Sequence, residues 1–377
     1  MFVFGLVLGV PGTVLAIPDL VARLDLTLAS RGTLISSLFL GLLVGSAASG
    51  PLVDRLGRRP LMAWSAVIVA LCLPAFAVSP SFPLAAAALA AVGLFSAGMN
   101  TAANAIASEL FPGERGRRMN AIALAVAAGG VTLPLTVAVT AGEVPWEVII
   151  GIAALLALGV GIIALRIRVP ETVGVGHALT WADVVTVLRQ ERIAVFGLLV
   201  MLAGGTEACL AGWTTTYLTA DGVSPAAATW VLAAVWGGWV AGRLVFARRV
   251  DRNKEGAVTV AAAAGAVCVT VMVLARDVRV MLVAPPLTGL VTAIVMPTIL
   301  AIAGERYPRH AGTLFGVLLT LAQLAAMILP SAVGLVAERA GVRAGLSLLI
   351  GTAGLIAATM AAMRATDAGP AGRRVPR

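Results

Sequence analysis

The chain has 377 residues, of which 60% are hydrophobic and only 12% are charged, and its mean hydropathy is +1.00. Soluble globular domains carry about 25% charged residues, so this composition excludes that class, excludes disorder, and indicates a protein embedded in lipid. The formal net charge of +9 does not indicate nucleic-acid binding, because the basic residues stand in short clusters between apolar stretches, as topology signals do.

Twelve apolar stretches are long enough to cross a bilayer as helices, since one span needs about 20 apolar residues. Breaks at Pro, Gly and charge clusters separate them. The predicted spans are 2–20, 33–53, 60–79, 83–108, 119–140, 146–166, 194–218, 225–247, 256–275, 279–303, 313–336 and 343–363. The connections are short, so we expect an all-α membrane protein with almost no mass outside the membrane.

The longest connection divides the chain into two sets of six spans. We predict one bundle over residues 1–168, a linker over 169–193, and a second bundle with a short basic tail over 194–377. Within the linker, Thr180 can cap a short amphipathic helix that begins at Trp181. We expect this helix to lie on the membrane surface.

The basic residues are distributed unevenly between the two sides of the membrane. With both termini on one side, 20 of the 27 Lys and Arg residues fall on that side and six on the other. Cytoplasmic loops are the ones enriched in Lys and Arg. We therefore expect both termini in the cytoplasm, and a monomer in an inner or plasma membrane.

The two sets of spans repeat part of their sequence. Residues 105–112 (AIASELFP) recur as residues 301–308 (AIAGERYP), at an offset of 196. At an offset of 197, Gly41 and Gly45 recur as Gly238 and Gly242. Six spans separate the copies, so both halves keep one orientation in the membrane. Parallel halves of six helices are the architecture of one large class of transporters.

Residues 50–59 (GPLVDRLGRR) lie between the second and third predicted spans. They resemble the signature G-x-x-x-D-R-x-G-R-R that the major facilitator superfamily carries at this place, and residues 168–172 (RVPET) are similar to its loop after the sixth span. The resemblance implies two pseudo-symmetric six-helix bundles that rock around a central site and move a small-molecule substrate by alternating access. It implies no covalent chemistry, so we expect neither enzyme activity nor a cofactor.

The residue types of the signature suit a gate. Gly50 would let its helix approach a neighbour closely, and Asp54 could cap a helix or pair with cations. Arg58 and Arg59 could bridge to Glu109 or Glu171. The alternative is that these arginines are topology signals only. The predicted gating residues are Gly50, Asp54, Arg55, Gly57, Arg58, Arg59, Glu109, Asp251, Arg252 and Arg243. Arg243 lies near the cytoplasmic end of its span. It either has a structural role, by extending to the membrane surface or by pairing with another group, or it faces the cavity and favours an anionic substrate.

Glu207 is the one carboxylate deep inside a predicted span. Surroundings of low dielectric favour the neutral form of a carboxylate, so such a group can take and release protons at physiological pH. Ionisable residues inside membranes are functional candidates by default. We predict that Glu207 carries a proton or binds substrate; the alternative is a neutral Glu that hydrogen-bonds a neighbouring helix.

Other polar and aromatic side chains inside spans are candidates for binding substrate. Asn100 and Asn104 are four residues apart and share one helix face, where their amides can both donate and accept hydrogen bonds. Interhelical hydrogen bonding is the alternative for these amides, and packing is the alternative for the aromatic residues. The predicted substrate-binding residues are Asn100, Asn104, Trp213, Trp236, Trp239 and Gln323.

Residues 207–243 also resemble helices 7 and 8 of the fucose permease branch of the superfamily. The matching positions are Glu207, Trp213, Tyr217, Leu218, Gly222, Val223, Ser224, Ala227, Trp236, Gly237, Gly242 and Arg243. The resemblance implies proton-coupled uptake of a sugar-like or other polar solute. The alternative is proton-coupled export of hydrophobic drugs or metabolites, which the apolar composition of the spans permits.

Overall fold

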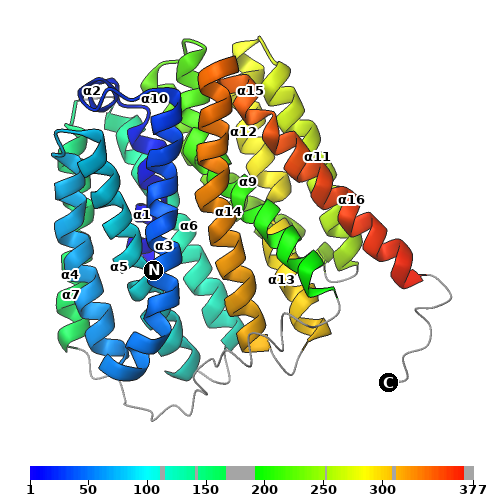
Figure 1. Ribbon diagram of the computed structural model, residues 1–377, viewed down its shortest axis with the longest axis horizontal. Helices are drawn as coiled ribbons and strands as arrows, with labels where there is room; N and C mark the ends of the chain where they lie inside the picture. The colour runs from blue at the N-terminus through cyan, green and yellow to red at the C-terminus, as the bar shows by residue number, and fades with distance from the viewer. Residues whose placement is uncertain (111–114, 141–142, 167–191, 251–252, 308–310, 369–377) are drawn as a thin grey trace.

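The structure is a computed structural model that describes residues 1–110, 115–140, 143–166, 192–250, 253–307 and 311–368. The regular elements of these residues are α-helices packed side by side (Figure 1). The first half of the chain contains α1 (Phe2–Val14), α2 (Pro18–Arg23), α3 (Leu28–Leu56), α4 (Arg58–Ala77), α5 (Phe82–Leu110), α6 (Arg115–Thr140) and α7 (Trp146–Arg166). The second half contains α9 (Ile193–Ala220), α10 (Pro225–Val250), α11 (Lys254–Leu274), α12 (Val278–Thr292), α13 (Val295–Arg306), α14 (Ala311–Ala340), α15 (Val342–Leu346) and α16 (Leu348–Ala368).

In the described part of the chain, 11 stretches of helix are long and apolar enough to cross a membrane. They correspond to the second through twelfth predicted spans. The prediction of one helix over 2–20 is wrong, because α1 ends at Val14 and α2 begins at Pro18. At 1.5 Å per residue, the 13 residues of α1 extend about 20 Å, and Figure 1 shows Met1 about halfway along the neighbouring helices. The predicted amphipathic helix of the linker lies outside the described residues.

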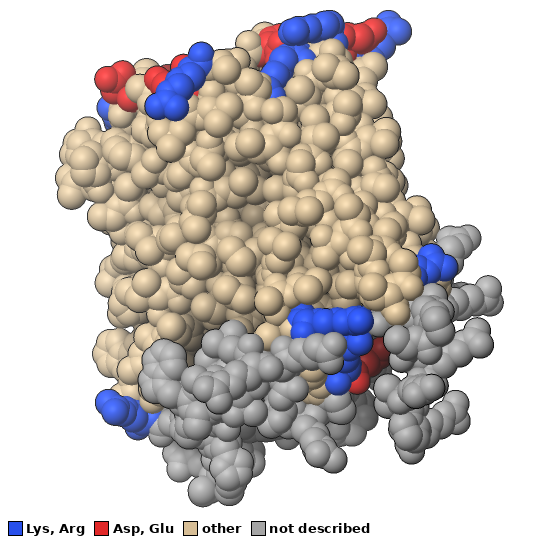
Figure 2. Space-filling view, turned by 45° about the vertical axis from the view of Figure 1, so that its right-hand side comes forward, with Lys and Arg blue, Asp and Glu red and all other residues tan. Residues whose placement is uncertain are grey.

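Charged side chains gather at the two ends of the molecule. We call the end at which α3 ends (Leu56) and α9 begins (Ile193) the linker face, and the end at which α3 begins (Leu28) and α14 ends (Ala340) the opposite face. Between them, Figure 2 shows a broad belt without charged side chains. Large apolar residues such as Leu71, which is 68% exposed, point outward from the belt. Such a surface matches the hydrocarbon core of a bilayer.

The internal repeat is visible in how the helices pack. In the first half, a Cβ atom on Gly41 of α3 would lie 1.9 Å from the carbonyl oxygen of Ala90 in α5. In the second half, a Cβ atom on Gly238 of α10 would lie 2.6 Å from the carbonyl oxygen of Pro286 in α12. The next repeated glycine on each helix makes the equivalent close contact one turn later. The two halves therefore contain the same helix–helix contact, built on the same small residues.

The repeat differs at one helix. In the first half α5 is a continuous helix of 29 residues, whereas in the second half α12 and α13 are separated at Ala293 and Ile294. Pro297 explains the break, because proline has no amide N–H and cannot donate to the carbonyl oxygen four residues earlier, that of Ala293. The first half has Thr101 at the equivalent position, and its helix continues.

Each half has an ion pair at the opposite face. In the first half, Arg23 of α2 lies 3.5 Å from Glu147 of α7 and donates a hydrogen bond to the carbonyl oxygen of Ala77 at the end of α4. In the second half, Arg343 of α15 lies 3.0 Å from Asp221, which follows α9, and donates to two carbonyl oxygens at the end of α11. The connected elements correspond, but the charges are reversed.

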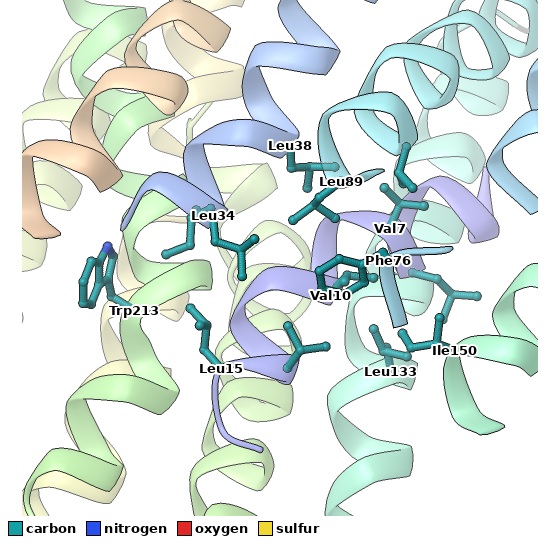
Figure 3. Close-up of a cluster of buried hydrophobic side chains, with 14 of the residues drawn as sticks. Val7, Val10, Leu15, Leu34, Leu38, Phe76, Leu89, Leu133, Ile150 and Trp213 are labelled. Carbon is teal, nitrogen blue, oxygen red and sulfur yellow. The ribbon is translucent and has the colours of Figure 1, made fainter. Parts of the chain in front are cut away.

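The two halves contact each other through a large apolar core around α1. Figure 3 shows Val7 and Val10 of α1 among side chains from α3, α4, α5, α6 and α7. Trp213 of α9 belongs to the same cluster, on the side where Leu34 and Leu15 lie. The second half therefore closes directly onto the first half at this level.

Candidate functional site

Glu207 lies in the middle of α9 and lines a narrow cleft inside the second half. Its Oε1 atom is buried and has no hydrogen-bond partner among the described residues. The centre of a water molecule can occupy about 20 Å³ of this cleft, close to the ~10–15 Å³ that a single water requires. The cleft is lined by Ala203, Thr206, Glu207, Leu210, Ala262, Thr292, Val295, Ala353 and Ile356. It has room for a water molecule beside the carboxyl group, but not for an organic solute.

The cleft forms where α9, α11 and α16 meet the break between α12 and α13. Thr292 and Val295 of its lining stand on either side of the break. Beside Glu207, the hydroxyl of Thr206 is hydrogen-bonded to that of Thr352 in α16, with 2.8 Å between the oxygens. This bond joins α9 to α16 next to the carboxyl group, so Glu207 faces the interior of the second half.

Arg243 of α10 approaches the same break from another side. Its Nε atom donates a hydrogen bond to the carbonyl oxygen of Ala293, at 3.4 Å. This is the carbonyl that Pro297 leaves without its helical donor. Arg243 and Glu207 are also close enough to attract each other electrostatically. The guanidinium group of Arg243 and the carboxyl group of Glu207 therefore both lie beside the break. We did not predict this arrangement from the sequence, although Pro297 indicates a helix break at this place.

Trp236 and Trp239 lie together on α10, with their ring centroids 5.0 Å apart and their planes at 89°. The ring of Trp236 covers Gly130 of α6, since a Cβ atom on that glycine would lie 2.3 Å from a ring carbon. Both tryptophans are buried, at 8% and 6% exposure, and neither indole N–H has an acceptor among the described residues. Trp236 is thus placed at the junction of the two halves.

The two asparagines of α5 bind each other. Nδ2 of Asn104 donates to Oδ1 of Asn100 at 3.0 Å and to its carbonyl oxygen at 2.9 Å. Both residues are partly buried. The predicted shared face exists in the structure, and these hydrogen bonds from Asn104 to Asn100 occupy part of the amide capacity that we assigned to substrate.

Gln323 and Trp213 are both at the junction of the halves. Nε2 of Gln323 in α14 donates to the hydroxyl of Ser46 in α3, at 3.1 Å, while its Oε1 is buried without a partner among the described residues. Trp213 is completely buried in the apolar core. Gln323 therefore bonds across the junction, whereas Trp213 fills it.

Several residues of the predicted gate lie at the linker face around the turn between α3 and α4, and one expectation for them is wrong. A Cβ atom on Gly50 would meet nothing within 4 Å, so Gly50 does not mark a close helix contact. The glycines that contact α5 closely, Gly45 and Gly41, lie five and nine residues earlier on this helix. Gly57 has φ of +81° at the turn between α3 and α4, a conformation that favours glycine. Arg59 donates from Nε to the carbonyl oxygen of Ala164 at 3.0 Å, which ties α4 to α7 within the first half.

The other gating predictions concern residues about which the structure says less. Arg55 is exposed in the last turn of α3. Arg58 is the first residue of α4, and its side chain interacts with another group of the protein. The side chains of Asp54 and Glu109 lie outside the described part, and so do Glu171, Asp251 and Arg252 altogether.

Comparisons with known proteins agree with this architecture. Residues 1–330 match the pattern of the Major Facilitator Superfamily. An uncharacterized MFS-type transporter of Bacillus subtilis (strain 168), YfkL, is 25% identical over 323 residues, which are 82% of this chain and 80% of the relative.

Solved structures share the fold. A mutant of the nucleoside transporter NupG superposes with a TM-score of 0.81 at 16% identity, covering 96% of this chain and 97% of that one. A bacterial homologue of the human lysosomal transporter Spinster, in an inward-facing and occupied conformation, gives 0.79 at 14% identity, over 100% and 97% of the two chains. The chain is a multi-pass membrane transporter rather than an enzyme, and it belongs to the major facilitator superfamily.

Proposed function

We propose that this transporter couples the movement of a small polar organic solute to that of a proton, and that Glu207 carries the proton. One observation supports this most directly. Glu207 places a carboxyl oxygen without a hydrogen-bond partner in a cleft that has room for water, at the break between α12 and α13. A buried carboxylate without partners is costly, so the group gains from taking a proton in one step of a cycle.

Other carboxylates are less suited to this role. Glu147 and Asp221 are in ion pairs at the opposite face, and Glu305 is paired with Lys254 near the linker face. Glu338 accepts a hydrogen bond from the backbone N–H of Ala29. These groups are solvated or already paired, whereas Glu207 is buried and lies within electrostatic reach of Arg243. Protonation would remove that attraction and so would change the balance of forces at the break.

Alternating access requires contacts between the halves that form in one state and break in another, and three hydrogen bonds across the junction suit this role. Between α3 and α14, hydrogen bonds join the halves from the opposite face inward: Ala29 to Glu338 at 3.0 Å, Ser36 to Ser331 at 2.8 Å and Ser46 to Gln323 at 3.1 Å. We infer that this state is closed at the opposite face. Opening there would require all three bonds to separate.

The remaining predictions fit this scheme and are part of the proposal. The halves 1–168 and 194–377 would move as two bodies joined by the linker 169–193, in an inner or plasma membrane, with the linker face toward the cytoplasm. Asn100, Asn104 and Gln323 would offer hydrogen bonds to a polar substrate, and uptake of a sugar-like solute stays the prediction from the resemblance to the fucose permease branch.

The test uses proteoliposomes that contain a pH-sensitive dye and the purified full-length protein. Sugars, nucleosides and organic acids are added one at a time, and proton movement is recorded. We expect a solute-dependent signal that Glu207→Gln abolishes and that the control Glu147→Gln keeps, because Glu147 is a half-exposed surface group. Undiminished coupling in Glu207→Gln would refute the assignment. If only hydrophobic drugs moved protons, and in the outward direction, the alternative of export would be favoured.

A further inference from the structure

One face of α10 presents three hydrogen-bond donors in a row. Trp236, Trp239 and Arg243 are separated by three and four residues, so they lie on the same side of the helix. The indole N–H groups of both tryptophans are more than nine-tenths buried and have no acceptor among the described residues. Buried donors are normally paired. We call these three residues the donor face of α10.

The donor face is directed at the junction of the two halves. Trp236 covers Gly130 of α6, in the other half. The internal repeat gives an independent indication for Arg243, because its equivalent in the first half, 197 residues earlier, is Ser46. The hydroxyl of Ser46 accepts its hydrogen bond from Gln323 of the other half. Arg243 therefore stands at a position from which a side chain reaches across the junction.

The guanidinium group of Arg243 is only partly used. It has five N–H donors, and among the described residues it makes one hydrogen bond, from Nε to the carbonyl oxygen of Ala293 at a long 3.4 Å. Its Nη groups remain available to a planar acceptor such as a carboxylate or phosphate. Glu207 is separated from the junction, in a cleft that holds no more than a water molecule. A solute at the donor face would thus contact the guanidinium group and the N–H donors, but not the carboxyl group itself.

We propose that the donor face of α10 binds a small organic anion between the two halves, with its acidic group on Arg243 and its other acceptor atoms on Trp236 and Trp239. Trp236 and Arg243 are seven residues apart, or about 10 Å along the helix, which suits an acidic group attached to one or two rings. This inference rests on the proposed function and names its substrate class. Glu207 and the anion attract the same arginine. When Glu207 takes a proton it no longer attracts Arg243, so Arg243 can bind the anion. The proton and the anion would therefore be carried together.

The experiment measures binding of defined probes to the purified full-length protein in detergent, by thermal unfolding and calorimetry. The anionic probes are benzoate and phenyl phosphate, and benzamide is the neutral counterpart of benzoate with nearly the same shape. We expect at least one anion to raise the unfolding temperature and benzamide to have no effect. Arg243→Gln should weaken anion binding at least 10-fold and Arg243→Lys should restore part of it, while Glu207→Gln should bind the anion several-fold more tightly than the wild type.

Three controls separate the possible outcomes. Trp239→Phe keeps an aromatic ring, although a smaller one, and removes one donor. It should weaken binding about threefold to tenfold even if Arg243→Gln fails to fold. Arg364→Gln removes an exposed arginine of α16 and should change nothing. Equal binding of benzoate and benzamide, unchanged anion affinity in Arg243→Gln or Trp239→Phe, or no binding of either anion overturns the anion site. Proton coupling through Glu207 is measured separately in vesicles, so either idea can fail while the other survives.

Discussion

Pro297 in the second half occupies the position that Thr101 occupies in the first half. Thr101 belongs to the continuous helix α5, while Pro297 leaves the carbonyl oxygen of Ala293 to Arg243 and separates α12 from α13. This difference between the two copies of the repeat thus accounts for the helix break beside which Glu207 and Arg243 lie.

Replacing Pro297 by the residue of the other half tests whether the break is needed for transport. Pro297→Thr supplies an amide N–H for the carbonyl of Ala293, so we expect a more continuous helix, an unfolding temperature that is unchanged or higher, and transport lowered at least 10-fold. Pro286→Ala is the matched control, because it also introduces the residue of the other half but leaves the break unchanged, and it should transport within about threefold of the wild type. Normal transport by folded Pro297→Thr would show that the break is not used.

Two adjacent glycines of α10 test the helix contact that the repeat preserves. A Cβ atom on Gly238 would collide with the carbonyl of Pro286, whereas one on Gly237 would meet nothing within 4 Å. We expect Gly238→Ala to lower the free energy of unfolding by about 1–3 kcal/mol through overpacking. Gly237→Ala should leave it unchanged or raise it by up to about 1 kcal/mol, since Ala is the better helix former. Chemical unfolding in detergent measures both, and equal effects would contradict the packing described here.

The ion pairs at the opposite face should differ in strength. Arg343 and Asp221 are 16% and 28% exposed, whereas Arg23 and Glu147 are 34% and 38% exposed. Exposed pairs are worth about 0.2–1 kcal/mol, and shielding from water increases the attraction. Double-mutant cycles with alanine should therefore give a coupling free energy of about 1–2 kcal/mol for the first pair and less than about 1 kcal/mol for the second. The reverse order would mean that exposure does not determine their strength.

A disulfide across the junction tests the closed state. Ser36 of α3 and Ser331 of α14 have their hydroxyl oxygens 2.8 Å apart. In a background that lacks Cys72, Cys209 and Cys268, we expect oxidation of Ser36→Cys/Ser331→Cys to stop transport and reduction to restore it, because the bond prevents opening at the opposite face. Each single cysteine variant serves as a control and should transport normally under oxidant. Full activity with a complete cross-link would argue against rocking of the two halves.

The sequence is a good guide to features that depend on local composition. Eleven spans follow from apolar length, and the contact at Gly41 and Gly238 follows from glycines that recur at a fixed offset. The prediction of one helix over 2–20 is wrong because α1 ends at Val14 and a separate short helix begins at Pro18. Apolar length alone does not reveal this division.

The candidate site was less accessible from the sequence, because side-chain partners depend on how each helix is rotated. Sequence shows that Glu207 is deep in the membrane, but not that it faces the interior of the second half and not the junction. It equally shows a glycine in the signature at Gly50, but cannot tell that the close contacts lie elsewhere on α3. The break at Ala293 was the exception, since a proline without a counterpart in the repeat could have revealed it.

The reversed ion pairs at the opposite face also bear on how the chain assembles. A chain built from two similar copies risks exchanging equivalent helices while it folds in the membrane. Here such an exchange would bring Arg23 against Arg343 and Glu147 against Asp221, like charges in place of opposite ones. The two copies thereby differ in the charges at this face, and opposite charges pair only when each helix packs within its own half.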